Sequence, residues 1–219
     1  MTVDWKFAWS ILPELLSGLL VTLKASLVGF AIAAVLGLVF ALARRSRSKW
    51  VSAPVGGLVE FVRSTPLLVQ LFFFFYVLPQ YGLRFPAFLV GTFALGLHYS
   101  TYTSEVYRAG IDAIAKEQWE ASTALNFSMT RTWVGVILPQ AIPPMLPALG
   151  NYLIGMFKES AQLAAITVVE LLQTGKIIGS HTFRYLEPIT LVGILFFALS
   201  YLSALALRQF EVRIERQHR

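Results

Sequence analysis

The sequence predicts an all-α integral membrane protein, folded as one bundle of five membrane-spanning helices. Of its 219 residues, 56% are hydrophobic and only 14% are charged, whereas a soluble domain carries about 25% charged residues. The apolar residues gather in runs of the length that a helix needs to cross a bilayer, about 20 residues. Because these runs are apolar on all sides, they disfavour a large soluble helical core, whose helices would need polar faces.

Five segments reach the length of a membrane span: residues 19–43, 64–83, 85–104, 132–157 and 188–207. The first carries one charge, Lys24, near its start, and the other four carry none. The tight connection between the second and third spans is marked by Pro79, Gly82 and Pro86. The fourth span contains prolines at positions 139, 143, 144 and 147. Each removes an amide donor, so the sequence predicts a bent or broken helix there.

The distribution of Lys and Arg predicts the orientation of the bundle, because basic residues are enriched in cytoplasmic loops. One set of alternate connections holds Arg44, Arg45, Arg47, Lys49, Arg108, Lys116, Arg131, Arg208, Arg213, Arg216 and Arg219. The opposite set holds fewer: Lys6, Arg84, Lys158, Lys176 and Arg184. We therefore expect the N-terminus outside and the C-terminus in the cytoplasm. Residues 160–172 are apolar but too short to cross, and they predict a short helix on the outer side before the polar residues 173–184.

Several classes of function are disfavoured by composition. The absence of cysteine excludes disulfides and thiol ligands, and the three histidines are scattered. The net charge of +6 sits at the ends of apolar runs, which argues against binding to nucleic acid. No nucleophile with a base, phosphate-binding loop or cleavable signal peptide is evident. We therefore expect neither an enzyme nor a bound metal or cofactor.

The segment 120–139, EASTALNFSMTRTWVGVILP, lies between the third and fourth spans on the predicted cytoplasmic side. Residues 116–125 contain good helix formers and no proline, and small side chains there permit a close approach by a partner. Trp119 adds apolar contact area and Glu120 adds charge. Asn126 follows, and asparagine tolerates the left-handed conformation that ends many helices. By itself this pattern also fits an amphipathic helix lying at the membrane surface.

The same segment closely resembles the coupling loop of importer permeases of the ATP-binding-cassette (ABC) class, EAA-x3-G-x9-I-x-L-P. Glu120, Ala121 and Ser122 occupy the EAA positions, and Asn126 replaces the turn glycine. Val136 stands at the isoleucine position, while Leu138 and Pro139 match. The resemblance implies that residues 116–139 bind an ATPase subunit and transmit its movements to the membrane domain.

Other stretches resemble permeases for polar amino acids (histidine, glutamate, glutamine, arginine and opines) in particular. They are FVRSTPLLVQL at 61–71, YTSEVYRAGI at 102–111 and LPQAIPPMLPALGNYLIGMFKESAQLAAI at 138–166. The similarity runs from about residue 15 to residue 208. Within this family, VVELLQTGKIIGSHTFRYLEPITLVG and the coupling loop look most like permeases for ectoine and hydroxyectoine.

The resemblance implies a five-span type I importer permease, 1–219 forming a single domain in the bacterial cytoplasmic (inner) membrane. Its partners would be two ATPase subunits, which bind the ATP and Mg, and a second permease, expected to be a different but related chain. An extracytoplasmic solute-binding protein would deliver the solute. Transport would follow alternating access, with ectoine or hydroxyectoine as the solute and polar amino acids as the alternative. A secondary transporter working without ATP is a more distant alternative.

Polar residues inside the spans are candidates for the transport pathway, because they are costly in a bilayer. We expect Gln70, Tyr102, Asn151, Lys158 and Glu159 to contact the solute. A zwitterion needs a cation for its carboxylate and an acceptor for its cationic group, and Lys158 and Glu159 supply both. Hydrogen bonds that merely join helices are the alternative for Gln70 and Asn151. The spacing of Glu60 with Arg63, and of Glu105 with Arg108, predicts two ion pairs that are structural or form a gate.

Overall fold

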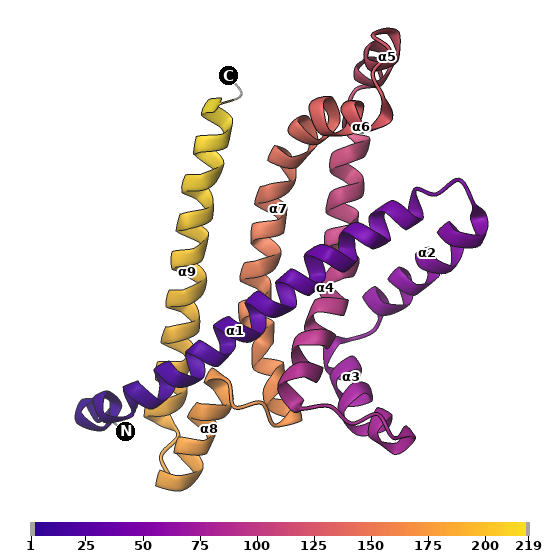
Figure 1. The fold of residues 1–219 in the computed structure, drawn as a ribbon. Coiled ribbons are helices and arrows are strands. Elements are labelled where there is room, and N and C mark those ends of the chain that lie inside the picture. The colour runs from indigo at the N-terminus through magenta and orange to yellow at the C-terminus, as the bar shows by residue number, and fades with distance from the viewer. Residues whose placement is uncertain (1–2, 218–219) are drawn as a thin grey trace.

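The computed structural model describes residues 3–217, and every helix among them connects to the next without a strand. The elements are α1 (Trp5–Arg44), α2 (Lys49–Ser64), α3 (Leu67–Phe72), η1 (Phe73–Val77), η2 (Leu78–Tyr81), α4 (Ala87–Asp112), α5 (Lys116–Ala124), α6 (Met129–Thr132), η3 (Trp133–Ile137), α7 (Leu138–Glu159), η4 (Ser160–Ile166), α8 (Leu171–Thr182) and α9 (Leu186–Gln217). The all-α prediction is therefore confirmed. Figure 1 shows α4, α7 and α9 running side by side, with α1 crossing them obliquely.

The first helix is much longer than the predicted span 19–43, because it begins at Trp5. Asp4 caps it, accepting hydrogen bonds from the amides of Lys6 and Phe7. Lys6 and Pro13 interrupt the apolar run but not the helix, which explains why hydropathy alone placed its start too late. At 1.5 Å per residue, α1 is about 60 Å long. That is twice the thickness of the hydrocarbon core, and an oblique path accommodates the excess.

A stripe of small buried residues brings α1 against α4. Ala25, Gly29, Ala33, Gly37 and Ala41 follow one another at intervals of four and are all buried. The hydroxyl of Thr103 on α4 donates to the carbonyl of Ala33 at 2.8 Å. A Cβ atom on Gly37 would lie 2.0 Å from Thr103 Oγ1. Small residues of this kind let two membrane helices approach closely, so the stripe sets the crossing of α1 and α4.

The second predicted span, 64–83, begins too early, because its helical run extends only from Leu67 to Tyr81. The chain forms α2 and then bends by 103° before the run of short helices from Leu67 to Tyr81. Pro66 disfavours helical backbone at the preceding residue, and Thr65 is extended, with φ −102° and ψ 137°. Past the bend, η1 is a π-helical turn in which the Leu78 amide donates to the Phe73 carbonyl, directly before Pro79.

The region of the fourth predicted span, 132–157, consists of α6, the π-helical turn η3 and α7. Three prolines lie inside α7, which nevertheless continues to Glu159. The prediction of a broken helix is therefore wrong at these three prolines, and the alternative of a bent helix stays a prediction. The irregularity lies earlier, at η3, where the Leu138 amide donates to the Trp133 carbonyl immediately before Pro139. A widened turn of this type is often found at functional sites.

The predicted helix at residues 160–172 is two elements. A 3-10 helix ends at Ile166, and Thr167 follows with a left-handed φ of +66°. Glu170 then caps α8, accepting hydrogen bonds from the amides of Leu172 and Gln173. Most of the stretch read as polar, 173–184, is thus helical. Hydropathy could not separate these elements, because the left-handed turn divides a single apolar run.

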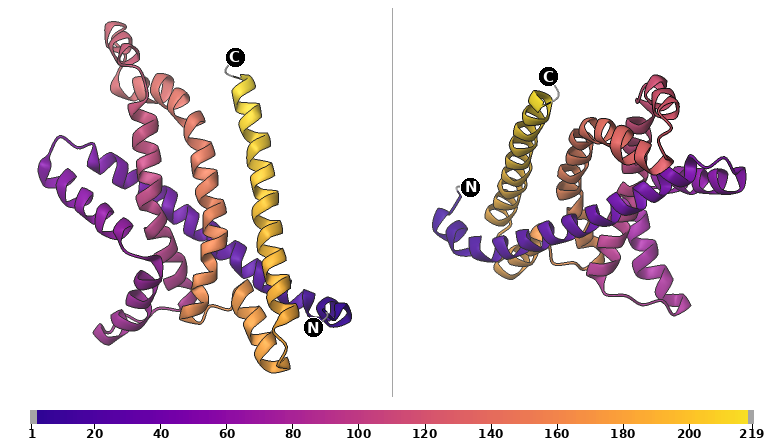
Figure 2. Two further views of the ribbon diagram at one scale, coloured as in Figure 1. Left: turned by 180° about the vertical axis from the view of Figure 1, so that it is seen from behind. Right: turned by 45° about the horizontal axis from the view of Figure 1, so that its top comes forward.

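Three of the described helices are long and apolar enough to cross a membrane: Trp5–Arg44, Met129–Ile166 and Leu186–Arg213. The bent pair from Lys49 to Tyr81 counts as a fourth if it forms one span. The five-span count and the orientation of the termini stay predictions. α1 begins and α9 ends at opposite ends of the bundle (Figures 1 and 2). The main core joins α1, α4, α7 and η4 around Leu95, Met156, Leu163 and Ile166.

Candidate functional site

The helix α5 projects from one end of the molecule, beyond the ends of α4 and α7 (Figures 1 and 2). Its two sides differ. Ser122 is buried and Trp119 is half-buried, so these side chains face the rest of the chain. Glu120 and Ala121 are exposed, and Leu125 exposes 66% of its surface. Of the residues predicted to contact an ATPase, Glu120 and Ala121 are accessible on α5, whereas Trp119 and Ser122 pack against the rest of the chain.

The turn after α5 has the geometry expected of its asparagine. Asn126 is left-handed, with φ +52°. The amide of Phe127 donates across it to the Ser122 carbonyl at 3.0 Å, the bond that closes a helix with a left-handed residue. The guanidinium of Arg131 lies 4.3 Å from the centre of the Phe127 ring. These contacts hold the start of α6 against the end of α5.

A side-chain contact links α5 to the base of α7. The rings of Trp119 and Trp133 meet edge to face, with centroids 5.2 Å apart. Both pack on a cluster formed by Ile111, Ala141 and Met145. Leu138 is half-buried and Pro139 is exposed at the junction of η3 and α7. Sequence reasoning did not select Trp133, although a second tryptophan 14 residues after Trp119 and next to the coupling turn was a usable signal.

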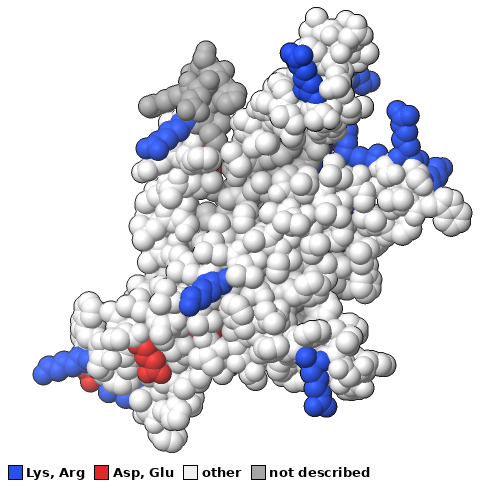
Figure 3. Space-filling view, viewed as in Figure 1, with Lys and Arg blue, Asp and Glu red and all other residues white. Residues whose placement is uncertain are grey.

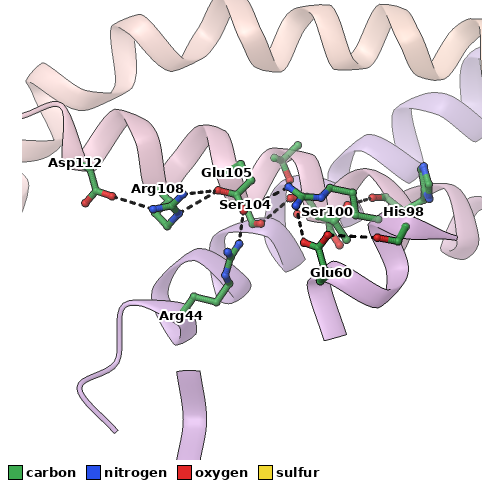
Figure 4. A network of polar contacts seen from close by, with 12 residues as sticks. Arg44, Glu60, His98, Ser100, Ser104, Glu105, Arg108 and Asp112 are labelled. Atoms are coloured by element: carbon green, nitrogen blue, oxygen red, sulfur yellow. Dashed lines mark hydrogen bonds and ion pairs between the residues drawn. The ribbon is translucent and has the colours of Figure 1, made fainter. Parts of the chain in front are cut away.

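The two predicted ion pairs are present, and they belong to one network (Figure 4). Arg63 binds Glu60 at 2.6 Å and Arg108 binds Glu105 at 2.8 Å. Glu105 also accepts a hydrogen bond from Arg44 at 2.5 Å and lies 3.7 Å from Arg63. One carboxylate of α4 thus holds arginines from α1, α2 and α4. The network continues through Asp112, which binds Arg108 at 3.5 Å and also binds Arg45.

A cavity of about 230 Å³ lies between α4 and α7, lined by His98, Tyr99, Tyr102, Tyr152 and Glu159. The three tyrosine rings stand with their centroids 5.7 to 6.0 Å apart. The hydroxyl of Tyr99 faces the Glu159 carboxylate. One oxygen of that carboxylate, Oε2, is buried without a hydrogen-bond partner among the described residues. Aromatic faces and a carboxylate together attract a cationic group.

The structure brings together two of the five predicted pathway residues, Tyr102 and Glu159. Lys158 and Asn151 are exposed and do not line the cavity. The buried carboxamide nitrogen of Gln70 donates to the Val62 carbonyl at 2.7 Å and approaches His98 Nδ1 at 3.1 Å. Gln70 therefore stabilises the bend between α2 and α3 and touches the cavity only through His98.

Tyr99 and Tyr152 were missed by sequence reasoning. The signal for Tyr152 was its spacing of seven residues from Glu159, which places both on one face of a helix. The signal for Tyr99 was its position three residues before Tyr102. Tyr102 also lies three residues before Glu105, so the cavity and the arginine network follow one another along α4.

Comparisons with known proteins identify the family. Residues 33–216 match the model of the family described as the inner membrane component of binding-protein-dependent transport systems. The chain is 50% identical over 211 residues to a probable amino-acid ABC transporter permease protein of Sinorhizobium fredii, covering 96% of this chain and 91% of that protein. It is 34% identical over 204 residues to the arginine transport system permease protein ArtQ of Bacillus subtilis, covering 91% of each.

The solved structures that this chain resembles are also ABC transporters. A chain from the crystal structure of an amino acid ABC transporter with histidines superposes with a TM-score of 0.91 at 38% identity, covering 97% of this chain and all of that one. A chain of the MetNI methionine ABC transporter superposes with a TM-score of 0.74 at 20% identity, covering 97% of this chain and 99% of that one, and so shares the fold. The protein has the type I ABC permease fold, its ATP is hydrolysed on a partner subunit, and it belongs to the family of binding-protein-dependent inner membrane transport components as the permease subunit of an amino-acid ABC importer.

Proposed function

We propose that this permease imports polar amino acids that carry a cationic side chain, such as arginine, lysine or histidine. One observation supports this more than any other: three tyrosines surround Glu159, whose Oε2 atom has no partner among the described residues. An unpaired buried acceptor costs roughly 1–3 kcal/mol, and a solute ammonium or guanidinium would remove that cost. The similarity to amino-acid permeases, one of them an arginine permease, supports the same class of solute.

In this proposal Glu159 accepts hydrogen bonds from the cationic group, and Tyr99, Tyr102 and Tyr152 contribute cation–π attraction. Lys158, which directly precedes Glu159 in the sequence and is exposed, binds the solute carboxylate from outside the cavity. Asn151 adds a hydrogen bond during passage. Gln70 acts through the His98 ring, which it contacts at 3.1 Å. The Glu105 network lies beyond the tyrosines and forms a gate that must open before the solute can leave.

We further propose that two ATPase subunits bind α5 and its counterpart on a second, related permease. The exposed Glu120, Ala121 and Leu125 form the docking face, with Asn126 holding the turn. ATP binding draws the two coupling helices together and opens the cavity outward, and hydrolysis resets it. A solute-binding protein delivers the solute from outside, and the match to the inner membrane component of binding-protein-dependent transport systems supports this partner.

Ectoine or hydroxyectoine is a second candidate solute. The observation that favours it is the same ring of tyrosines, because a delocalised amidinium also binds aromatic faces. The resemblance of residues 168–193 and of the coupling loop to ectoine permeases pointed to this solute from sequence. Amino acids take precedence, since the named relatives are amino-acid permeases.

The test is solute-stimulated ATPase activity of the complete complex in proteoliposomes with its solute-binding protein. The panel contains arginine, lysine, histidine, glutamine, glutamate, ectoine and hydroxyectoine. Strongest stimulation by a cationic amino acid supports the proposal. Stimulation by ectoines alone replaces it with the second candidate, and stimulation by glutamate alone contradicts both.

Variants connect the result to the cavity. Glu159→Gln removes the charge but keeps the shape, and we expect uptake of a cationic amino acid to fall at least tenfold. Glu14→Gln changes an exposed glutamate of α1 and serves as the matched control. Lys158→Ala should raise the solute concentration for half-maximal uptake while leaving the complex assembled. Unchanged uptake kinetics in both Glu159→Gln and Lys158→Ala would remove this cavity from the pathway.

A further inference from the structure

A second cavity, separate from the one lined by tyrosines, is an apolar groove at the surface of the bundle. It has a volume of about 410 Å³, and it is bounded by Val28 and Ile32 of α1, Phe74 of η1, and Leu89 and Phe93 of α4. The rings of Phe74 and Phe93 meet edge to face, with their centroids 5.5 Å apart. Val28, Leu89 and Phe93 are exposed, so the groove is open along one side.

The lining of the groove suits an apolar ligand. Among the described residues that line it, Thr92 alone has a polar side chain. Its hydroxyl already donates to the carbonyls of Phe88 and Leu89, at 2.9 and 3.1 Å. A ligand in the groove would therefore gain free energy by burying CH₂ groups, each contributing about 0.8 kcal/mol. A hydrocarbon chain is such a ligand.

The groove lies on the side of α4 that faces away from the solute cavity. Leu89 and His98 are nine residues apart, as are Phe93 and Tyr102, and nine residues make about two and a half helical turns. Figure 3 shows the face of the molecule crossed by α1, where charged side chains are few between the two ends of the bundle. Because a second permease would share the solute pathway on the other side of α4, we expect this surface of an inner membrane component to meet lipid.

Lys24 stands on the groove side of α1. It lies four residues before Val28 and eight before Ile32, so the three side chains share one face of the helix. Lys24 is exposed. Long side chains on a helix point toward its N-terminus, which directs the ammonium group of Lys24 toward the end of the groove. A lysine in this setting keeps its stem on apolar surface and its charge near the headgroups.

Arg84 lies at the same end of the groove. α1 and α4 both run toward the end of the bundle that carries α5 (Figure 1). A Cβ atom on Gly29 would lie 3.4 Å from the Thr92 carbonyl oxygen, so Lys24, five residues earlier, is level with the first turn of α4. Arg84 is exposed just before α4 and directly precedes Phe85, which lines the groove. Neither cation has an ion-pair partner among the described residues.

We propose that the groove binds an anionic phospholipid, with an acyl chain between α1 and α4 and the phosphate near Lys24 and Arg84. Basic residues at the membrane surface attract anionic headgroups, and the apolar lining accounts for the chain. The cations lie at the end of the bundle opposite α5 (Figure 1), so the lipid belongs to the outer leaflet in the orientation predicted above. Binding of this lipid does not depend on which solute the permease carries.

The test is binding of lipid to the purified complete complex in detergent, measured by native mass spectrometry. Phosphatidylglycerol and phosphatidylcholine with the same acyl chains are titrated separately. We expect the wild type to bind phosphatidylglycerol about tenfold more tightly, equivalent to about 1.4 kcal/mol. Lys24→Gln and Arg84→Gln should each weaken that binding about fivefold, the effect of one basic residue near an anionic surface, and leave phosphatidylcholine unaffected. Leu89→Trp fills the groove and should weaken the binding of both lipids.

Two control variants change the same residue types elsewhere. Lys6→Gln removes an exposed lysine of α1 that lies 18 residues before Lys24, on the same side of the helix but outside the groove. Leu202→Trp enlarges an exposed leucine of α9. The lipid site is overturned if the wild type binds the two lipids equally. It is also overturned if Lys6→Gln weakens phosphatidylglycerol binding as much as Lys24→Gln, or if Leu202→Trp acts like Leu89→Trp.

Failure of the lipid site and failure of the proposed function are distinguishable. A complex that responds to a cationic amino acid in the ATPase panel but binds the two lipids equally retains the function and lacks the lipid site. A complex that prefers phosphatidylglycerol through Lys24 and Arg84 but responds only to other solutes has the lipid site and a different function.

Discussion

Trp119 of α5 and Trp133 of η3 meet edge to face, with ring centroids 5.2 Å apart and planes at 80°. Between the two tryptophans the chain extends beyond the bundle and reverses direction at Asn126. The contact between the rings therefore joins α5 directly to the segment that leads back into the bundle. We therefore expect a movement of α5 to reach α7 through these packed side chains as well as through the backbone. Trp133 is the first residue of the π-helical turn η3, which leads directly into α7, so such a movement would enter α7 at this turn.

Trp133→Leu should weaken coupling without releasing the ATPase. An edge-to-face aromatic pair is worth roughly 0.5–1.5 kcal/mol beyond its buried area, so α5 would lose part of its connection to α7. We expect the ATPase to co-purify normally while solute stimulation of hydrolysis falls several-fold. Trp50→Leu, at a tryptophan of α2 that is 92% exposed, is the control. Equal stimulation in the two variants would show that the contact transmits nothing.

Ala121→Trp should prevent the ATPase from docking, because it adds a large side chain to the exposed face of α5. The expected result is loss of the ATPase subunit on purification, with the permease still folded. Glu120→Ala should give a milder loss together with reduced uptake per ATP hydrolysed. Ala53→Trp, at an exposed alanine of α2, controls for the added bulk. Normal ATPase retention and uptake in Ala121→Trp would contradict the docking face.

Glu105→Gln should destabilise the junction of α1, α2 and α4. The neutral amide leaves Arg44, Arg63 and Arg108 without their shared carboxylate. A hydrogen bond to a charged group contributes about 2 kcal/mol, so a clear fall in melting temperature is expected. Glu60→Gln is the comparison, because Glu60 is the more exposed partner of Arg63 and an exposed pair is worth about 1 kcal/mol or less. Equal melting temperatures for the two variants would contradict a central role for Glu105.

Gly96→Ala should disrupt the packing of α1 on α4. A Cβ at this position would lie 2.8 Å from the backbone oxygen of Gly29 and 2.6 Å from Ile32 Cγ2, and the backbone oxygen cannot rotate away. We expect a lower melting temperature and a poor yield of the assembled complex. Gly57→Ala provides the control, because nothing lies within 4 Å of a Cβ there and alanine favours a helix. A harmless Gly96→Ala would mean that the helices separate at little cost.

Stability should depend on pH through Glu170, which lies outside the spanning helices. Burial raises the pKa of this carboxyl from 4.5 to about 7, outweighing the hydrogen bonds from the Leu172 and Gln173 amides and the charge of Lys176. A raised folded pKa means that the folded protein holds the proton more tightly than the unfolded chain. The stabilisation from protonation is therefore complete below about pH 4.5 and is lost as the pH rises through about 7.

The measurement for Glu170 is the melting temperature of the complex between pH 5 and pH 8. The wild type should lose stability over this interval by more than Glu170→Gln, whose side chain stays neutral throughout. Glu14→Gln, at an exposed glutamate, should behave like the wild type. If the wild type and Glu170→Gln change in parallel, another group accounts for the pH dependence.

The all-α fold and the left-handed turn at Asn126 could be predicted from sequence, because both depend on local chemistry. Long apolar runs have few ways to exist outside a bilayer. Asn126 adopts its left-handed φ of +52° by its own preference. The Glu60–Arg63 and Glu105–Arg108 pairs follow from a spacing of three on a helix. Each of the last two features is determined by residues within one or two helical turns of one another.

The tertiary structure decided the features that depend on which helix faces meet. Glu105 gathers Arg44 and Arg63 from other helices, and Tyr102 meets Tyr152 across a separation of 50 residues at 5.7 Å. The start of α1 at Trp5 depends on the Asp4 cap and on the contacts of Asp4 with Arg184 and Glu187. Sequence determines the type of each segment through local propensity and hydropathy. Packing between distant segments determines the tyrosine-lined cavity, the Glu105 network and the α8–α9 loop. The contacts in these places form only after helix backbones have come close together at glycines such as Gly37 and Gly96.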